Sequence, residues 1–371
     1  MDLRRRGEDG FIAWIGRRFG RLAPPPPAGI GDDAALRRMG GAALLTTDCL
    51  VEGVHFRRDE PAFLLGRKSL AVNLSDIAAM GGRPDCFLMV LAVPDDLPSS
   101  FLGNLIDGMA SAAREHGVAL AGGDTSRSAG PLVIAITVAG RTQVGRGARV
   151  LTRSGARPGD GIYVSGALGD SAAGRRLLDL GWRPRPAGRA KRQTGAGRAR
   201  VAGVTSPAGG RGRRLAGSLP PIRARQALGK HLDPQPQLAL GRWLLSHRVA
   251  SAAIDLSDGL STDLARLTAA SRVGARLLAP AVPIGDPARA VAAALGEDPL
   301  GLALHGGEDY ELLFTVPAAR EPELLRLPAG LPGAFFIGRI TSRLQGIRLA
   351  EPSGRDRPLR AGGFDHFLTS R

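Results

Sequence analysis

Short apolar runs alternate with longer, largely apolar stretches along most of the chain. In the first 150 residues this alternation predicts strands at 42–51, 86–93, 118–121 and 132–141, and helices at 61–80 and 99–116. Further on it predicts strands at 161–164, 252–256, 311–316 and 335–340, and helices at 170–180, 237–247 and 260–270. The order of the first set, βαβ with an extra antiparallel return, predicts a ferredoxin-like half. We therefore expect an α/β fold with an N-terminal domain at 1–150 and a larger C-terminal domain at 151–371.

Length and composition agree with a folded enzyme of two domains. A chain of 371 residues is too long for one ordinary core, and a hydrophobic fraction of 43% is that of a globular protein. The two cysteines, Cys49 and Cys86, are too few for a disulfide framework, which indicates a reducing compartment. No apolar run approaches the roughly 18 residues that a membrane span needs, and no secretory leader is recognisable at the N-terminus. We expect a cytoplasmic protein.

The net charge of +16 is concentrated in one segment, residues 183–225. This segment holds twelve Lys and Arg residues and no acid, so the rest of the chain carries only +4. It is rich in Gly and Pro and lacks hydrophobic periodicity, which predicts a disordered or loosely ordered insertion. A solvated loop is the favoured interpretation over an RNA or anion tether, because a basic run without interleaved aromatic residues gives only non-specific attraction.

Five acidic clusters stand where apolar runs give way to turns or helices. They centre on residues 31–34, 46–48, 73–76, 122–125 and 254–259. Carboxylates with neighbouring hydroxyl groups are the hard oxygen ligands that Mg²⁺ prefers. Two carboxylates about 4 Å apart repel by roughly 4 kcal/mol at an effective dielectric of 20, so a shared cluster needs cations. Each cluster alone could be a turn or a helix cap, but five together predict a site for several divalent ions and an anionic ligand.

Asp76 illustrates the two interpretations. It lies in a predicted helix that is apolar on nearly every side, so we expect its carboxylate to be buried and strongly partnered. A salt bridge to Lys68, two turns earlier, is the structural alternative to a metal ion. The other acidic clusters favour the metal.

The glycine-rich segments do not match a known phosphate-binding loop. Residues 122–125 and 306–309 read as turns after strands, where backbone can approach a phosphate or substrate closely. The run at 66–69 fails the P-loop pattern, and protein-kinase signatures are missing. A nucleotide would therefore be held through metal ions bridged by carboxylates.

These motifs together resemble the thiamine-monophosphate kinase family. The resemblance rests on segments in family order along nearly the whole chain: 31–33, 46–48 with 51–56, 71–82, 122–125, 151–155, 254–260, 306–312 and 364–367. The family belongs to the superfamily of aminoimidazole ribonucleotide synthetase and selenophosphate synthetase. The resemblance implies an N-terminal domain whose sheet pairs across a homodimer, a larger C-terminal α/β domain, and ATP-dependent phosphorylation of thiamine phosphate to thiamine diphosphate.

The resemblance also implies roles for individual residues. The positions that match Mg²⁺ ligands are Asp33, Thr46, Thr47, Asp48, Asp76, Asp124, Asp255 and Asp258. The positions that match nucleotide contacts are Gly123, Asp124, Arg153 and Ser257. The positions that match thiamine-phosphate contacts are His55, Glu308 and Phe364. Glu308 can accept from the aminopyrimidine, Phe364 offers a π-face to a cationic heterocycle, and His55 can donate to the phosphate. Each also has a purely structural alternative: Glu308 as a turn residue, Phe364 as a C-terminal anchor and His55 as a surface residue.

Two departures from the family pattern are visible: His305 stands where a small residue is common, and the basic insertion is long.

No catalytic nucleophile or base is predicted, since a substrate phosphate can attack directly. Two alternatives stay open. One is a cyclo-ligase or selenophosphate-type synthetase of the same superfamily. The other is a non-catalytic RNA- or anion-binding protein acting through residues 183–225. We expect neither a specific nucleic acid nor a membrane as partner.

Overall fold

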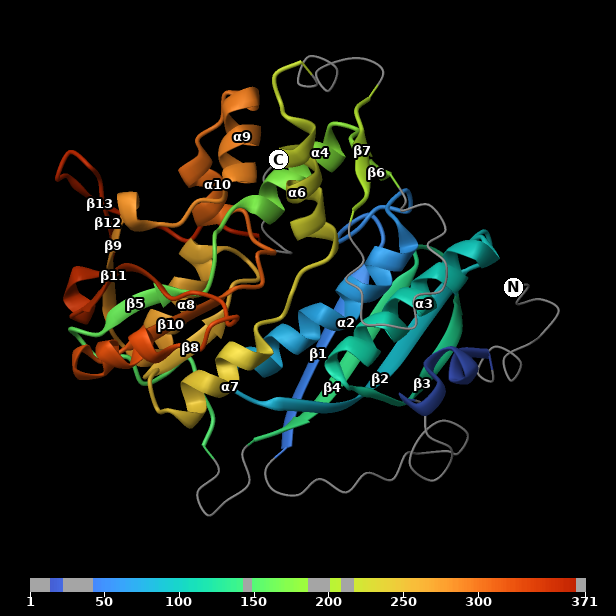
Figure 1. Cartoon of the computed structure of the whole chain (residues 1–371), viewed down its shortest axis with the longest axis horizontal. Coiled ribbons are helices and arrows are strands. Elements are labelled where there is room, and N and C mark those ends of the chain that lie inside the picture. The colour runs from blue at the N-terminus through green and yellow to red at the C-terminus, as the bar shows by residue number, and fades with distance from the viewer. Residues whose placement is uncertain (1–13, 23–42, 143–148, 186–200, 208–216, 365–371) are drawn as a thin grey trace. The chain divides into compact units, whose positions relative to one another are not determined.

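The computed structural model describes residues 14–22, 43–142, 149–185, 201–207 and 217–364 (Figure 1). The chain divides into two compact units. The first comprises residues 1–77, 82–148 and 188–199, and the second comprises 78–81, 149–187 and 200–371. Each unit is described by itself below.

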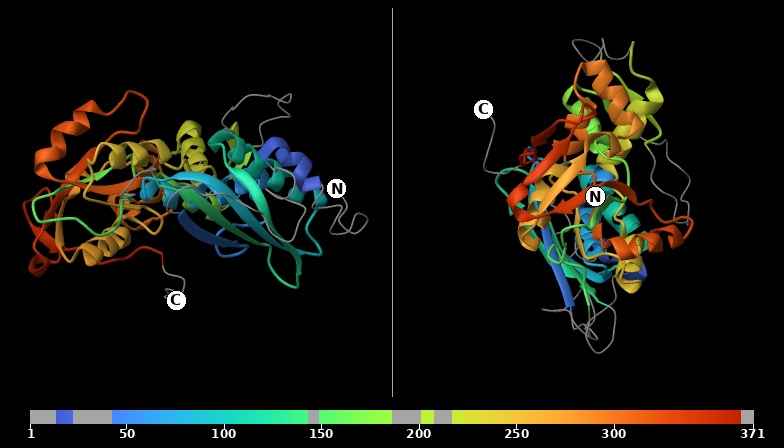
Figure 2. Two further views of the ribbon diagram at one scale, coloured as in Figure 1. Left: turned by 90° about the horizontal axis from the view of Figure 1, so that it is seen from below. Right: turned by 90° about the vertical axis from the view of Figure 1, so that its left-hand side faces the viewer.

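The first unit is built on a four-stranded sheet in the order β1-β4-β2-β3. Its strands are β1 (Ala43–Val51), β2 (Arg83–Pro94), β3 (Ala119–Ser128) and β4 (Val133–Arg141). β2 and β3 are parallel, whereas β4 is antiparallel to both β1 and β2. Figure 2 shows these strands, blue to green, as one twisted layer. The central strands therefore hold β1 and β3 at opposite edges of the sheet.

Two helices, α2 (Ala62–Ala79) and α3 (Ser99–His116), cover one face of this sheet (Figure 1). They approach closely because glycines lie at their contact: a Cβ on Gly66 would stand 1.9 Å from the Leu105 carbonyl oxygen, and one on Gly108 would stand 1.8 Å from that of Phe63. Burial along β4 alternates strictly between intermediate and buried positions, as expected for a strand with one face against helices. The opposite face leaves Leu45, Leu88 and Val90 exposed.

The second unit is built on a seven-stranded sheet in the order β13-β12-β9-β11-β5-β10-β8. Its strands are β5 (Gly161–Val164), β8 (Ala252–Asp255), β9 (Gly274–Leu278), β10 (Leu312–Val316), β11 (Phe335–Thr341), β12 (Ile347–Ala350) and β13 (Asp356–Pro358). All neighbours are antiparallel except β12 and β9. The three strands β5, β8 and β10 are buried at every position, which explains why they are short and mostly apolar, apart from Asp255 in β8 and Thr315 in β10.

The helices of this unit are α4 (Asp170–Asp179), α6 (Pro221–Leu232), α7 (Leu238–Ser246), α8 (Leu260–Ser271), α9 (Asp286–Leu295) and α10 (Pro299–His305). Single-turn and longer 3₁₀ segments lie at Gly20–Leu22 in the first unit and at Ala279–Ala281, Ala318–Arg326 and Arg343–Gln345 in the second. α4 packs on α6 and α9, and α8 packs on β8. The alternation of strands and helices follows the order predicted from the sequence, although α6, α9, α10 and the strands β9, β12 and β13 were not predicted.

Two segments differ from expectation. Residues 122–125 were expected as a turn, but they continue β3, because Gly123 lets the strand lie against β2: a Cβ there would stand 1.8 Å from the Met89 carbonyl oxygen. Within the basic segment 183–225, β6 (Arg183–Arg185) pairs with β7 (Gly203–Thr205), and α6 begins at Pro221. The rest of that segment, 186–200 and 208–216, lies outside the described residues.

Candidate functional site

In the first unit, the structure brings Thr46 and Asp76 into contact. The Thr46 hydroxyl on β1 donates a hydrogen bond to the carboxylate of Asp76 on α2. Asp48 lies two residues beyond Thr46 and therefore on the same face of the strand, whereas Thr47 faces the other side, where it bonds the Ile136 carbonyl oxygen at 3.1 Å. Asp76 is half-buried rather than buried as expected, because it faces β1 at the rim of the helix-covered side. Two carboxylates and a hydroxyl on one face are donors that suit Mg²⁺.

His55 lies in a tight turn that defines which ring nitrogen it presents. The Val51 amide donates to His55 Nδ1 at 3.0 Å, so Nδ1 is the acceptor and Nε2 carries the proton. Glu52 braces the turn by accepting from the Arg58 guanidinium and from the Leu132 amide at 2.9 Å. The hydrogen bonds from Arg58 hold the pKa of Glu52 below its usual range. The turn thus presents His55 as a hydrogen-bond donor, the role expected toward a phosphate.

Asp124 is not next to Asp48 within this unit. It lies on β3, exposed and in register with Val90 of β2, so β2 and β4 separate it from β1. Three strand spacings amount to about 14 Å. Asp33, the remaining acidic residue expected from this part of the chain, lies outside the described residues.

In the second unit, the predicted motif 254–259 stands at the end of β8 and the start of α8. Asp255 is the last residue of β8 and is 4% exposed. Asp258 forms an ion pair with Arg266, which also contacts Asp263 at 2.9 Å. Asp263 accepts from the backbone amides of Asp258 and Gly259 at 3.0 and 3.1 Å. It therefore shapes the turn that carries Asp258, a contribution that sequence reasoning missed.

Burial of Asp263 in this turn affects its acidity. Desolvation, reinforced by the nearby charge of Asp258, raises the pKa of Asp263 to about 6. Arg266 opposes this rise. The spacing of Asp258 and Asp263 along the start of a helix was visible in the sequence, but it did not reveal that one carboxylate would cap the other's backbone.

Backbone hydrogen bonds bring Glu308 and Phe364 to the same turn. The Glu308 amide donates to the Ser257 carbonyl oxygen at 2.7 Å, and the Phe364 amide donates to that of Asp258 at 3.2 Å. Four predicted residues, Ser257, Asp258, Glu308 and Phe364, thus meet although they are separated by up to 107 positions in sequence. The Phe364 side chain is 48% exposed, so its ring is accessible to a ligand.

The backbone just before Phe364 is held beside His305. The Gly362 amide donates to Ser261 Oγ at 3.2 Å, and that hydroxyl lies 2.8 Å from His305 Nδ1. His305 therefore supports the segment that carries Phe364. Arg153 lies in an exposed segment whose backbone accepts from Ser271 at 2.9 Å.

A buried polar network adjoins this turn. Asp309 accepts from the Gly169 amide at 2.9 Å at the start of α4, and burial raises the pKa of Asp309 to about 7. Glu311 contacts Lys230 Nζ at 2.9 Å and Ser165 Oγ at 2.6 Å. Asp170 accepts from the Ala288 amide at 2.9 Å, and burial raises its pKa to about 6. Asp309 and Glu311 stand inside a motif that the sequence singled out, whereas Lys230 carried no signal.

Among the described residues, no group of three or more His, Cys, Asp or Glu side chains is close enough to hold a metal ion. The predicted metal-ligand carboxylates that the structure describes form two sets. Asp48 and Asp76 lie near Thr46 in the first unit, and Asp255 and Asp258 lie at the end of β8 in the second unit. Asp124, on β3, belongs to neither set. The donor chemistry of both sets fits a hard cation. No described helix is long and apolar enough to cross a membrane.

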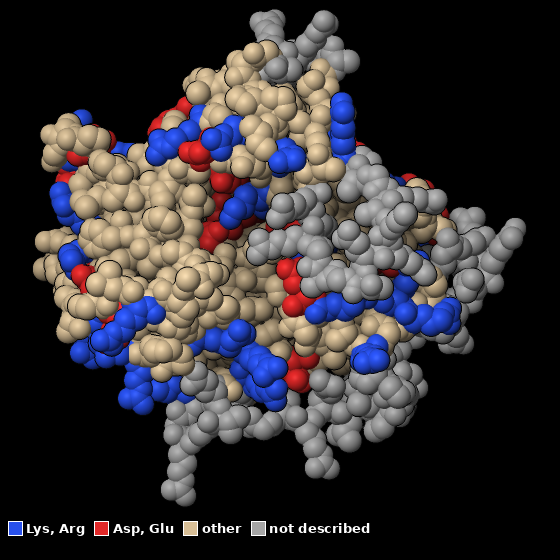
Figure 3. Space-filling view, viewed as in Figure 1, with Lys and Arg blue, Asp and Glu red and all other residues tan. Residues whose placement is uncertain are grey.

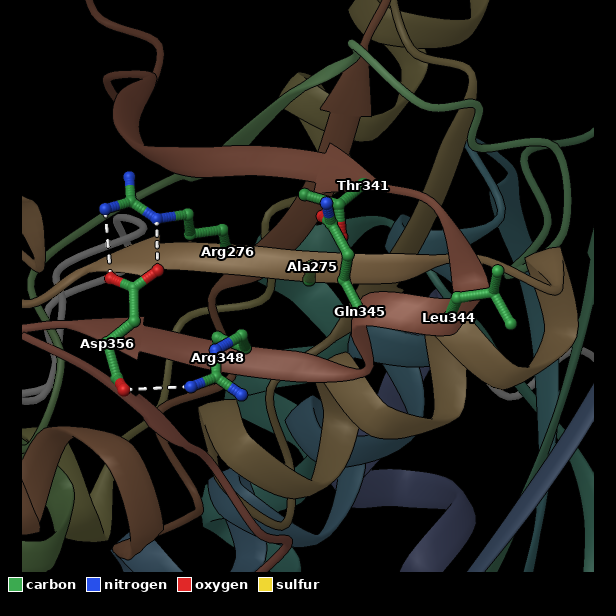
Figure 4. Close-up of a pocket in the computed structure, with 7 residues that line it drawn as sticks. All are labelled: Ala275, Arg276, Thr341, Leu344, Gln345, Arg348 and Asp356. Carbon is green, nitrogen blue, oxygen red and sulfur yellow. Dashed lines mark hydrogen bonds and ion pairs between the residues drawn. The ribbon is translucent and has the colours of Figure 1, made fainter.

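A pocket of about 510 Å³ lies elsewhere in the second unit (Figure 4). It is lined by residues of β9, β11, β12 and β13, and the Arg276 guanidinium forms two hydrogen bonds with the Asp356 carboxylate beside it, at 2.8 and 3.0 Å. In the sheet order these strands stand on the side away from β8 and β10. The pocket therefore includes none of the predicted site residues.

Comparison with known proteins defines the class first. Residues 31–142 match the family model of the AIR synthase related protein, N-terminal domain, and residues 211–348 match that of its C-terminal domain. The chain is thus a two-domain α/β protein of the AIR synthase-related class, which confirms the predicted fold class. Structures of the hydrogenase maturation protein HypE are 21% identical with TM-scores up to 0.69, which shows the same fold.

More similar proteins define the family. The chain is 37% identical over 371 residues to thiamine-monophosphate kinase of Escherichia coli K12, covering 97% of this chain and 99% of the relative. The crystal structure of thiamine-monophosphate kinase from Stenotrophomonas maltophilia is 36% identical, with a TM-score of 0.71 over 91% of this chain and 95% of that one. The structure of AaThiL complexed with AMPPCP and TMP is 29% identical, with a TM-score of 0.69 over 99% of both chains. The chain belongs to the thiamine-monophosphate kinase family and is a phosphotransferase.

Proposed function

We propose that this chain transfers the γ-phosphoryl group of ATP to thiamine monophosphate, giving thiamine diphosphate and ADP. The observation that carries the proposal is the meeting of Ser257, Asp258, Glu308 and Phe364 at one turn, in a chain of this family. The relative AaThiL was solved with AMPPCP, an ATP analogue, and TMP, which supports ATP as co-substrate. The alternative superfamily activities and a role confined to RNA or anion binding are not favoured by the relatives.

The described surface also gives no support to a binding role for the basic residues alone. On the face in Figure 3, Lys and Arg side chains form small groups with Asp and Glu among them. Several described arginines form ion pairs, such as Arg58 with Glu52 and Arg223 with Asp286. Charge of this kind provides solubility and weak, salt-sensitive attraction rather than a specific nucleic-acid site.

Several Mg²⁺ ions are proposed as cofactors. Their ligands would come from Thr46, Thr47, Asp48, Asp76, Asp124, Asp255 and Asp258, with Asp33 from outside the described residues. Thr46 and Asp48 share one face of β1, and Asp76 of α2 contacts Thr46 on that face, which supports this assignment. When bound, the ions would neutralise the triphosphate and the transferring phosphoryl group.

The proposed ATP contacts are Gly123, Asp124, Arg153 and Ser257. Gly123 supports this role because it is exposed on β3, where its backbone is accessible to a ligand. Arg153 is exposed, so its guanidinium can reach an anionic ligand in water. With metal ions binding the phosphates, the protein does not need a glycine-rich phosphate-binding loop.

Thiamine monophosphate would be held by His55, Glu308 and Phe364. His55 presents a protonated Nε2 that can donate to a phosphate oxygen. Glu308 has an accessible carboxylate with a side chain 27% exposed, which can accept from the aminopyrimidine. The exposed Phe364 ring offers a π-face to the thiazolium cation.

The reaction needs no general base from the protein. The attacking oxygen belongs to the substrate's own phosphate, which is already an anion near neutral pH, so the transfer can proceed in line without a phosphoenzyme. The protein's residues would bind both substrates, align the attacking oxygen with the γ-phosphorus and exclude water from it. Catalysis thus reduces to positioning and charge neutralisation.

We propose a homodimer in which the partner subunit completes the metal site. The face of the first-unit sheet opposite α2 and α3 exposes Leu45 (73%), Leu88 (45%) and Val90 (39%), which is an apolar surface suited to a second copy. Asp124 is in register with Val90 on that face and about 14 Å from β1 in its own protomer. Ligands of one Mg²⁺ each lie about 2.1 Å from the ion, so Asp48 and Asp124 of one protomer cannot share it. We propose that Asp124 of the partner subunit reaches Asp48 around β1, which is an edge strand of its sheet.

A cytoplasmic location is proposed from the cysteines. Cys49 is exposed and Cys86 is buried, and both are free thiols. An exposed free thiol is typical of a reducing compartment.

The function is tested by the dependence of ADP formation on thiamine monophosphate in the presence of Mg²⁺. The wild-type chain should release ADP only when both are supplied, and Asp48→Asn or Asp76→Asn should reduce kcat by roughly a hundredfold or more, because each removes a charged ligand. Circular dichroism should show that both variants stay folded. Near-normal rates in both variants would contradict the metal assignment.

A further inference from the structure

His231 is a buried histidine to which no role has been given so far. It lies in the last turn of α6 and its side chain is 0% exposed. α6 packs closely against α4 at Gly174: a Cβ there would stand 2.3 Å from the Ala227 carbonyl oxygen and 2.8 Å from the Cβ of His231. The ring is therefore held where two helices meet, with little freedom to turn.

The ring points its Nδ1 atom toward Glu308. Nδ1 lies 3.2 Å from Glu308 Oε2 and 3.1 Å from Ser171 Oγ on α4. An ionised carboxylate can only accept, so the proton on this contact belongs to the imidazole. The next residue back, Lys230, contacts Glu311 Oε1 at 2.9 Å. The end of α6 thus holds the segment 308–311 at two carboxylates.

The backbone of Glu308 explains why such support is needed. Its φ is +56°, a left-handed conformation that is uncommon for a residue with a long side chain, and Gly307 before it and Tyr310 after it also have positive φ. The Glu308 amide, which donates to the Ser257 carbonyl oxygen, fixes the backbone of this turn. Without a second contact, a partly exposed glutamate has several rotamers available.

We infer that His231 is the positioning residue for Glu308: its Nδ1–H holds Oε2 and so orients the carboxylate toward the amino group of the substrate's pyrimidine. The inference rests on the proposed function, because it assumes that Glu308 meets the substrate. A carboxylate held in one orientation loses less conformational entropy on binding and discriminates better between a donor and an acceptor in the ligand.

The Ser171 hydroxyl alone could accept the proton of His231 Nδ1. The additional contact with a partly exposed carboxylate, 77 positions away in sequence, therefore indicates a role at the site beyond packing. The contact predicts that loss of His231 lowers kcat/KM for substrates that donate a hydrogen bond to Glu308. It should have little effect on kcat/KM for substrates that do not.

The experiment compares kcat/KM for thiamine monophosphate with that for its analogue in which the pyrimidine amino group is replaced by an oxo group. His231→Phe removes the donor but fills the space, and His231→Asn keeps a donor near the position of Nδ1. His231→Gln places its amide nearer the position of Nε2 and serves where His231→Phe is too unstable to assay. His247→Asn is the matched control, since His247 stacks on Trp243 at the end of α7 and has no part in the site.

In the wild-type enzyme the amino compound should be strongly preferred. His231→Phe should lower kcat/KM for thiamine monophosphate roughly tenfold through KM, leave the value for the oxo analogue within about twofold, and leave the KM for ATP unchanged. His231→Asn should restore most of the preference, and His247→Asn should behave as wild type. In a Glu308→Gln background, His231→Phe should have little further effect, because both changes remove the same interaction.

Three results separate failure of the inference from failure of the proposed function. A wild-type enzyme that phosphorylates thiamine monophosphate but whose preference is unchanged in folded His231→Phe or His231→Gln overturns the inference alone. Equal losses on both substrates would likewise show a purely structural histidine. A wild-type enzyme that phosphorylates neither compound overturns the proposed function and the inference with it.

Discussion

At the scale of single residues, the structure links each side chain that we propose to contact the substrate to a backbone hydrogen bond. His55 is oriented by the Val51 amide, Glu308 by its bond to Ser257, and Phe364 by its bond to Asp258. These three residues follow from the sequence only through motif resemblance, because each alone could be a surface or turn residue. What the sequence could not reveal are their supports. His231 and Ser171 lie far from Glu308 along the chain, and no local pattern marks a contact of this kind.

Phe364 offers a direct prediction at this scale. Phe364→Ala should raise the KM for thiamine monophosphate roughly 2- to 30-fold, the range of a cation–π contact worth about 0.5–2 kcal/mol, and leave the KM for ATP unchanged. Steady-state kinetics with each substrate varied in turn provides the measurement.

Phe335→Ala is the matched control, because Phe335 is similarly exposed, 45% against 48%, and lies on β11 without a proposed role. An unchanged KM in Phe364→Ala, or an equal rise in both variants, would remove Phe364 from the substrate site.

At the scale of elements, the sequence predicted most strands and helices but misread β3. The pair Gly122–Gly123 suggested a turn, since glycines commonly end a strand. The structure instead uses Gly123 for a close approach of β3 to β2, which local sequence cannot distinguish from a turn. The short strands β9, β12 and β13 were missed because each is stabilised by its neighbours in a large sheet rather than by its own pattern.

The close approach at Gly123 can be tested by adding one methyl group. Gly123→Ala places a Cβ 1.8 Å from the Met89 carbonyl oxygen, so β3 must move and the Tm should fall by roughly 2–10 °C. Gly130→Ala is the control, because nothing lies within 4 Å of a Cβ there and its φ is not positive. Thermal unfolding followed by circular dichroism would show equal Tm values for the two variants if the account of β3 is wrong.

The start of α4 gives a second prediction at this scale, concerning pH. Burial raises the pKa of Asp309 to about 7, above its value in the unfolded chain. The folded state therefore binds the extra proton at low pH, and the associated stability is lost as the pH rises from about 4 through 7. Asp309→Asn removes this titration.

The quantity to measure is the difference in Tm between wild type and Asp309→Asn at pH 5 and pH 8. Between pH 5 and pH 8 the Tm of wild type should fall relative to that of Asp309→Asn, because only wild type loses the stability that comes from the protonated Asp309. A difference that stays constant over this range would show that Asp309 does not titrate as its burial implies.

At the scale of the whole molecule, the two-domain α/β class follows from the order of apolar runs, and membership of the family follows from motifs along the chain. The distribution of the proposed metal ligands does not follow from the sequence. Motif order gives no indication that Asp48 and Asp124 stand at opposite edges of one sheet, because strand order within a sheet is a property of the folded chain. The sequence also could not show that Leu45, Leu88 and Val90 form an exposed apolar surface, because apolar residues in predicted strands are expected in the core.

A shared site between subunits predicts complementation. Asp48→Asn and Asp124→Asn homodimers should each be inactive, whereas a hybrid dimer of the two has one site with both carboxylates intact. Differently tagged chains, co-expressed and purified through both tags, should therefore show about half the activity of wild type. An inactive hybrid dimer would place both residues in the site of one protomer and contradict the shared arrangement.

The most direct test of the central claim is phosphorus NMR of the reaction of this chain with Mg-ATP and thiamine monophosphate. We expect the monophosphate resonance to be replaced by the two coupled resonances of thiamine diphosphate, one equivalent for each ADP formed and dependent on Mg²⁺. An unchanged thiamine monophosphate resonance, with ADP accompanied only by inorganic phosphate, would contradict phosphoryl transfer to this substrate.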